Sequence, residues 1–343
     1  MRRHVCVIAL AVAVVALAAR SGRPAEDAAE TAEASETPLG MVDAVPVPTM
    51  GGVQFWADEL FFHRWRIQRH ATEGHYRLLD GNYLRHASGT YEQCLAKLRE
   101  IRKERSLPPM QGKAVLVLHG LGRTRNSMLI LSKYLERTGG YTVFNVAYPS
   151  TRQGIGDHAA SLANIIDNLE GIEEINFVGH SLGNIVIRRY LAQRTEEPTG
   201  RCPDPPVKRF VMLGPPNHGS VAATSLADNR VFSTVLGKSA QELGREWVWL
   251  ESDLATPQCE FGIIAGGLGN ERGFNPMLPG DDDGVVTLES ARLAGAGDFL
   301  VVPVLHTLLP SDPRVLKATL SFLTHGYFLS ADQRTPVTEE KEE

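Results

Sequence analysis

A regular alternation of apolar runs and helical patterns from residue 110 onward is the feature that most restricts the fold. The runs are short and almost continuously apolar, and they cover residues 113–119, 141–148, 175–178, 209–213, 260–265 and 299–304. Apolar residues at helical spacing follow in the stretches 126–138, 157–169, 182–194 and 311–323. Buried strands alternating with helices predict an α/β fold, a mainly parallel sheet with helices on both faces. Ligands of such sheets bind beyond the carboxyl ends of the strands.

Composition excludes several other classes of protein. The chain has 343 residues, of which 43% are hydrophobic, so it can bury a core. Its 35 basic and 40 acidic residues give a formal net charge of −5, which provides no electrostatic case for binding nucleic acid. Four Cys in a chain of this length do not form a disulfide scaffold.

The amino terminus has the pattern of a secretory signal. Arg2 and Arg3 precede an apolar stretch over residues 5–19, and Ala16-Leu17-Ala18 supplies small residues for cleavage. The stretch is shorter than the roughly 20 residues that a spanning helix needs. We therefore expect a cleaved signal over residues 1–22 and an extracytoplasmic protein, secreted or periplasmic. An uncleaved membrane anchor is the alternative.

The rest of the chain divides by composition and pattern. We expect a disordered acidic linker over residues 23–52 and a helical extension over residues 53–109. A catalytic domain follows over residues 110–328, with a possible lid at residues 220–256, and an acidic tail covers residues 329–343. Residues 55–69 mix aromatic residues with arginines, which we interpret as an amphipathic helix packed on the main domain rather than a nucleic-acid surface. Thr90-x-x-Gln93 predicts a capped helix that ends before Pro108. Residues 220–256 fit a mobile lid and a static covering layer equally well.

Three Cys remain after removal of residues 1–22: Cys94, Cys202 and Cys259. Cys202 and Cys259 each precede a predicted strand, so both could lie at the same edge of the sheet. Export would allow them to be oxidised, and a disulfide between them is our hypothesis.

The strongest chemical signal is Gly179-His180-Ser181-Leu182-Gly183, which follows a predicted strand and opens a predicted helix. This is the context of a nucleophile elbow, in which a strained turn lifts the serine hydroxyl above the sheet. The glycines let strand and helix pack closely. The helix amino terminus behind Ser181 favours developing negative charge.

A serine nucleophile needs a base and an acid, and the chain order expected for this elbow is serine, acid, histidine. His306 ends an apolar run and is the preferred base, whereas His325 precedes Gly326 late in a helix and fits a helix cap. We interpret His119 and His180 as structural. The acid is expected in Asp281-Asp282-Asp283-Gly284, where Gly284 allows a turn that favours Asp283. Asp281 and Asp282 stay open as alternatives, and the three carboxylates show no calcium-ligand pattern.

Two backbone amides should form the oxyanion hole. The Leu182 amide directly follows the nucleophile. The second donor is expected in His119-Gly120-Leu121-Gly122 after an early strand, at Leu121.

Taken together, these motifs resemble lipase-like α/β-hydrolases over residues 110–326. The resemblance includes His306-Thr307-Leu308-Leu309 and the loop at residues 214–220, in which we assign no role to His218. It implies an α/β-hydrolase fold, with Ser181 as nucleophile, His306 as base, Asp283 as acid and Leu121 and Leu182 as oxyanion donors. It implies no cofactor and no metal.

The signal pattern and this resemblance together predict an exported serine hydrolase that cleaves a carboxylic or lipid ester. A thioesterase, an amidase or an acyltransferase would use the same triad. A non-catalytic binding protein on the same scaffold is a further alternative. Contact with a lipid or membrane surface is possible, and the oligomeric state stays open.

Overall fold

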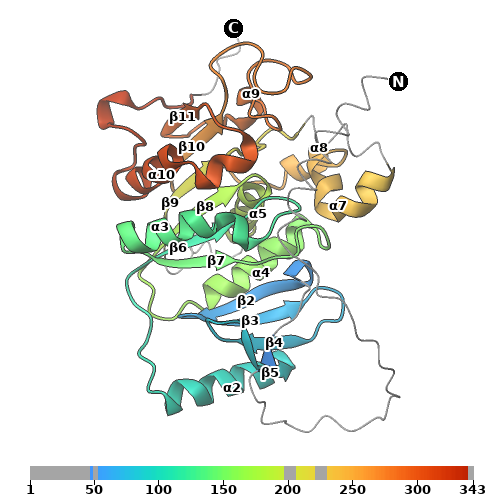
Figure 1. The fold of residues 1–343 in the computed structure, drawn as a ribbon, viewed down its shortest axis with the longest axis vertical. Helices are drawn as coiled ribbons and strands as arrows, with labels where there is room; N and C mark the ends of the chain where they lie inside the picture. Colours follow the sequence, from blue (N-terminus) through green and yellow to red (C-terminus); the bar gives the residue numbers. More distant parts are fainter. Residues whose placement is uncertain (1–46, 49–52, 197–205, 221–229, 339–343) are drawn as a thin grey trace.

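The structure is a computed structural model and describes residues 47–48, 53–196, 206–220 and 230–338 (Figure 1). The predicted signal at residues 1–22 and most of the linker at residues 23–52 lie outside these ranges. Within them, no helix combines the length and the apolar character needed to cross a membrane.

The main sheet has six parallel strands in the order β11-β10-β9-β8-β6-β7. The strands are β6 (Lys113–Leu118), β7 (Thr142–Val146), β8 (Glu174–His180), β9 (Val207–Leu213), β10 (Glu260–Gly266) and β11 (Asp298–Val302). Each coincides with one of the six apolar runs, so the predicted parallel α/β sheet is confirmed.

Helices cover both faces of this sheet (Figure 1). They are α3 (Leu129–Gly139), α4 (Ile155–Asp167), α5 (Leu182–Glu196) and α10 (Pro313–His325), with the shorter α7 (Arg230–Leu243), α8 (Trp247–Glu251) and α9 (Leu288–Ala291). Successive residues of β6 point to opposite faces. Leu116 packs in a core with residues of α4 and α5, whereas Val115 and Val117 pack with residues of α3 and α10. Burial on both faces explains why the strands are continuously apolar.

The predicted helical extension at residues 53–109 is wrong for most of its length. The short helix η1 (Val53–Phe55) opens the segment, and a five-stranded antiparallel sheet follows in the order β1-β5-β4-β3-β2. Its strands are β1 (Val47–Pro48), β2 (Trp56–Phe62), β3 (Trp65–His70), β4 (Tyr76–Leu79) and β5 (Leu84–Gly89). Residues 55–69 therefore form a hairpin and not an amphipathic helix. Six successive residues of β2 are buried, so the alternation that marks a half-exposed strand is absent.

Only the end of the extension is helical, as predicted. Helix α2 (Tyr91–Glu104) begins after Thr90, and the side chains of Thr90 and Gln93 form the expected capping box. Cys94 on α2 is buried with a free thiol. Cys259 has no disulfide partner among the described residues, and Cys202 lies outside them, so the bond between these two stays a prediction.

Two buried carboxylates join the small sheet to the main domain. Asp58 on β2 exchanges hydrogen bonds with Ala147, its amide donating to the Ala147 carbonyl at 2.9 Å and its Oδ2 accepting from the Ala147 amide at 2.7 Å. Asp58 also accepts from Arg66 and Gln68 at 3.1 and 2.8 Å. Glu59 accepts from Arg69 on β3 and from two residues of α4. The rings of Phe61 and Phe144 pack beside these contacts, with centroids 5.1 Å apart.

Substituting Asp58 with alanine is expected to lower the free energy of unfolding by about 3 kcal/mol. The change leaves the buried Arg66 guanidinium without its counterion, and breaking such a pair from one side is strongly destabilising. Urea unfolding would measure the effect. Glu100→Ala is the matched control, because it removes a half-exposed carboxylate whose loss should cost less than about 1 kcal/mol. Equal costs in the two variants would contradict the expectation.

Candidate active site

Ser181 occupies the turn between β8 and α5 in a strained backbone conformation. Its φ of 53° lies in the left-handed region, which a non-glycine residue seldom adopts. The Ser181 amide donates to the Leu213 carbonyl at 2.9 Å, which holds the turn against β9. A Cβ at Gly179 would lie 2.8 Å from the Asn184 amide, and one at Gly183 would lie 2.6 Å from the Leu118 carbonyl. Both glycines are therefore required for close approach of the strand and helix.

His306 and Asp283 lie in direct contact. Their hydrogen bond joins His306 Nδ1 to Asp283 Oδ2 at 2.6 Å, and both side chains are buried. The other carboxylate oxygen of Asp283 accepts from the amides of Val285 and Val286 at 3.0 and 2.7 Å. The His306 amide donates to the Asp283 carbonyl at 2.8 Å. Both residues are thus held in place from several directions.

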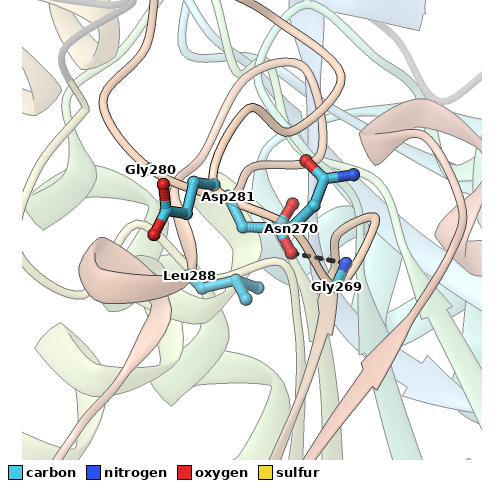
Figure 2. A pocket seen from close by; sticks show the side chains of 6 residues that line it. Gly269, Asn270, Gly280, Asp281 and Leu288 are labelled. Atoms are coloured by element: carbon cyan, nitrogen blue, oxygen red, sulfur yellow. Dashed lines mark hydrogen bonds between the residues drawn. The ribbon is translucent and has the colours of Figure 1, made fainter.

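The two neighbouring carboxylates serve other purposes. Asp281 accepts from the Leu268 and Gly269 amides at 2.8 and 2.7 Å, and it lines a shallow surface pocket of about 410 Å³ (Figure 2). Asp282 is buried and accepts from the amides of Asn275 and Gly284. Burial raises the pKa of Asp282. Only Asp283, the preferred acid, meets the His306 ring.

Ser181 and His306 are brought to the same end of the sheet. A Cβ built on Gly120 would lie 3.1 Å from Ser181 Cβ, and one built on Gly214 would lie 3.0 Å from His306 Nδ1. In the part of the chain that the structure describes, no hydrogen bond joins the Ser181 hydroxyl to the His306 ring. Hydrogen bonds of this kind are often long until substrate binds.

His180 packs against His306, the candidate base. Its Nε2 lies 3.0 Å from the His306 carbonyl, and because a carbonyl only accepts, Nε2 carries the proton. The two rings are 4.8 Å apart. Burial, followed by the proximity of His306, holds the pKa of His180 well below its usual range. His180 is therefore a neutral donor that anchors the His306 loop, consistent with its predicted structural role.

The loop of residues 119–122 follows β6 and lies beside Ser181. Tyr148 donates from its hydroxyl to the His119 carbonyl, and the two rings stack with centroids 4.1 Å apart. The Gly122 amide donates to Ser150 Oγ at 3.1 Å. Within the described residues, the amides of Leu121 and Leu182 donate no hydrogen bond to another protein group. Leu182 is the first residue of α5, where intrahelical acceptors are lacking.

The position of these loops in the sheet identifies the architecture. Strand order reverses at β6, because β7 lies on one side of it and β8 on the other. The loops that follow β6 and β8 therefore meet at a topological switch point, the place where open α/β sheets bind ligands. A serine in a strained strand-to-helix turn follows β8 at that point. The chain has the α/β-hydrolase fold.

Comparisons with known proteins add structural similarity alone. No model of a known family matches the chain, and no curated protein matches it in sequence. Among solved structures, the lin2722 gene product of Listeria innocua is 16% identical with a TM-score of 0.45, covering 68% of this chain and 99% of that one. The metagenomic carboxyl esterase MGS0156 is 17% identical with a TM-score of 0.43, covering 57% and 65%. Phospholipase PlaB from Legionella pneumophila is 17% identical with a TM-score of 0.39, covering 52% and 44%.

Two further histidines are buried in or near the loop of residues 119–122. Burial lowers the pKa of His119 to about 4 and that of His158 to about 3. The His158 ring packs against Tyr148, and its Nε2 lies 3.3 Å from Ser239 Oγ. Both imidazoles are therefore neutral in the folded protein at physiological pH.

These two histidines predict a loss of stability in mild acid. Unfolded histidines take up protons below about pH 6.5, whereas the folded ones stay neutral until the pH is far lower. The unfolded state therefore binds more protons between these values, and stability rises with pH. Each histidine should lower the free energy of unfolding by about 2 kcal/mol at pH 5 relative to pH 7.5. Urea unfolding at both pH values tests this: His158→Gln should show a smaller pH difference, and an unchanged difference would contradict it.

The loop at residues 214–220 makes contacts that hold it against α5 and α8. Asn217 is buried and accepts from Arg188 on α5 at 3.1 Å. His218 is exposed and its Nδ1 lies 3.4 Å from Glu251 Oε1, with no hydrogen bond to Asp283 or His306 within the described ranges. His325 is the last residue of α10, and Gly326 caps that helix in a left-handed conformation, as predicted.

The described part of the possible lid packs on the loops that follow β6 and β7. Helix α7 is kinked at Gly237, where a Cβ would lie 1.9 Å from the Thr151 carbonyl. Leu236 lies over Gly122, and Ser239 donates to the Gln153 carbonyl at 2.8 Å. Residues 221–229 lie outside the described ranges. Whether residues 220–256 form a lid or a fixed cover stays a prediction.

One group of described residues has the composition of a metal site. His70, Glu73 and His75 at the β3–β4 turn place their donor atoms within 4.8 Å of one another. However, the two imidazoles stack, with centroids 5.0 Å apart and ring planes 11° from parallel. Ring lone pairs lie in the ring planes, so these two do not converge on one ion. His70 Nδ1 also accepts from the Glu73 amide at 3.2 Å.

Proposed function

We propose that this protein is an exported serine hydrolase that cleaves carboxylic esters through an acyl-enzyme intermediate. The observation that carries the proposal is the buried Asp283–His306 pair beside Ser181 at the nucleophile elbow. The signal pattern at residues 1–22 supports export.

The proposed reaction uses groups of this chain alone. Ser181 Oγ attacks the ester carbonyl, and His306 Nε2 takes the hydroxyl proton, because Nδ1 is engaged by Asp283. Asp283 orients the imidazole and stabilises the imidazolium. The amides of Leu121 and Leu182 stabilise the oxyanion. The tetrahedral intermediate collapses, His306 returns the proton to the departing alcohol, and water hydrolyses the acyl-serine by the same steps in reverse.

Exposed apolar side chains near the base favour an acyl or lipid ester over a small polar one. Leu305 and Leu308, on either side of His306, are 43% and 50% exposed. Burial of such surfaces against an acyl chain would be favourable. A thioesterase, an amidase and an acyltransferase remain alternatives that share the triad.

Covalent labelling combined with a substrate series tests the proposal. A fluorophosphonate should modify the folded protein on the peptide that contains Ser181, as identified by mass spectrometry. p-Nitrophenyl esters of increasing acyl length should be hydrolysed, and their profile would separate a carboxylesterase from a lipase. Labelling at another serine, or no labelling of folded protein, would overturn the assignment.

A further inference from the structure

Arg123 joins the two loops that flank the candidate nucleophile. It follows the oxyanion loop directly, and its amide donates to the Gly120 carbonyl at 3.2 Å. Its own carbonyl accepts from Gln54 Nε2 at 2.6 Å. The guanidinium reaches the opposite loop, where Nη2 lies 3.5 Å from the carbonyl of Thr307, the residue after His306. The side chain of Arg123 therefore extends from the loop of residues 119–122 to the loop that carries His306.

This guanidinium has few protein partners. No carboxylate in the described ranges forms an ion pair with Arg123, and its Nε is buried without a hydrogen-bond partner. Burial alone lowers its pKa, with no acidic group acting in the opposite direction. Arg66, by contrast, is paired with Asp58, and Arg188 donates to the carbonyls of Ala255 and Asn217. A guanidinium offers five donors, and Arg123 uses one long hydrogen bond.

Burial of a cation without a counterion is unfavourable, because the charge loses hydration that no protein group replaces. A strap between the two loops would not need a charge, since a neutral side chain could donate to the Thr307 carbonyl. The unused donors are therefore available to a substrate group that binds between the loop of residues 119–122 and the loop that carries His306. Planar guanidinium groups match carboxylate and phosphate oxygens in bidentate geometry.

We infer that Arg123 is a specificity residue that binds a negatively charged group, a carboxylate or a phosphate, close to the scissile ester of the substrate. This inference rests on the proposed function and names the class of ester within it. The substrate would be an acidic ester or a phospholipid rather than a neutral ester.

A matched pair of chromogenic esters tests the inference. The ratio of kcat/KM for mono-p-nitrophenyl glutarate, which is anionic, to that for neutral p-nitrophenyl butyrate would be measured in wild type, Arg123→Gln, Arg123→Lys and Arg137→Gln. The ratio should fall about 10-fold or more in Arg123→Gln, as expected for loss of a charged hydrogen bond. Arg123→Lys should retain part of it, because it keeps the charge but loses the fork geometry. Arg137→Gln removes an exposed charge on α3 and should leave the ratio unchanged.

Each other outcome overturns the inference. An equal fall for both esters in Arg123→Gln would mean that Arg123 is only a strap, and an unchanged ratio would mean that it does not bind an anion. A short-chain phosphatidylglycerol compared with the matching diacylglycerol in mixed micelles distinguishes phosphate from carboxylate recognition.

A binding measurement separates this inference from the proposed function. If no ester is cleaved in a Ser181-dependent manner, the proposed function fails. Calorimetric titration with glutarate and glycerol 3-phosphate, and with neutral glutaramide as control, then decides the inference alone. Anion binding that Arg123→Gln abolishes would support the site, whereas no binding, or equal binding to the variant, would overturn it.

Discussion

Substitution of Ser181 by alanine is expected to lower kcat for ester hydrolysis by between about three and six orders of magnitude, with little change in KM. The hydroxyl is the only atom of this side chain that could form the acyl-enzyme, and the amides that would stabilise the oxyanion stay in place. The elbow should also survive, because its geometry depends on the Ser181 backbone and on the two glycines rather than on the hydroxyl. Steady-state rates with a p-nitrophenyl ester would measure the loss.

The control for this substitution is Ser321→Ala on α10. Ser321 donates to the Tyr327 carbonyl at 2.9 Å, so its hydroxyl is structural and lies on an element that covers the sheet. Its activity should stay within about threefold of wild type, as is usual for a surface substitution of about 0.5 kcal/mol or less. Ser181→Ala protein that keeps wild-type activity while remaining folded would show that the nucleophile lies elsewhere.

Asp283→Asn is expected to reduce kcat by about 10³- to 10⁴-fold. The amides of Val285 and Val286 both require an acceptor at this side chain. An asparagine must therefore turn its oxygen toward these amides and its NH₂ group toward His306. The imidazole would then accept at Nδ1 and carry its proton on Nε2, which is the tautomer that cannot take the Ser181 proton. The fold should be preserved, because the backbone contacts of the loop are kept.

Asp281→Asn is the matched control for this prediction. It makes the same chemical change two residues away, where the carboxylate accepts from the Leu268 and Gly269 amides and does not contact His306. We expect a loss of less than about 10-fold in kcat, since only loop geometry is affected. A large loss of kcat in Asp281→Asn together with a small loss in Asp283→Asn would show that Asp283 is not the catalytic acid.

Several features of this protein follow from local sequence. Buried parallel strands are continuously apolar and the helices between them keep their own spacing, so the six strands and their alternation with helices are visible without a structure. The elbow is equally local, since Ser181 and its two glycines act within one turn. Chain order and the end of the last predicted strand were enough to predict that His306 lies near Ser181, because the carboxyl ends of parallel strands meet at one edge of the sheet.

Other features depend on contacts between residues far apart in the chain. Asp281, Asp282 and Asp283 are chemically identical neighbours. Gly284 favoured Asp283 without excluding the other two, and the packing of their loop against β10 and the His306 loop places Asp283 against the imidazole. Residues 55–69 are strands because both faces of β2 are covered, which removes the period that would distinguish strand from helix. The position of Arg123 beside Thr307, 184 residues away, has no local signal either. Periodicity and turn chemistry act over a few residues and so determined the strands and the elbow. Tertiary packing decided which carboxylate contacts His306, the β-sheet extension and the position of Arg123 between the two loops.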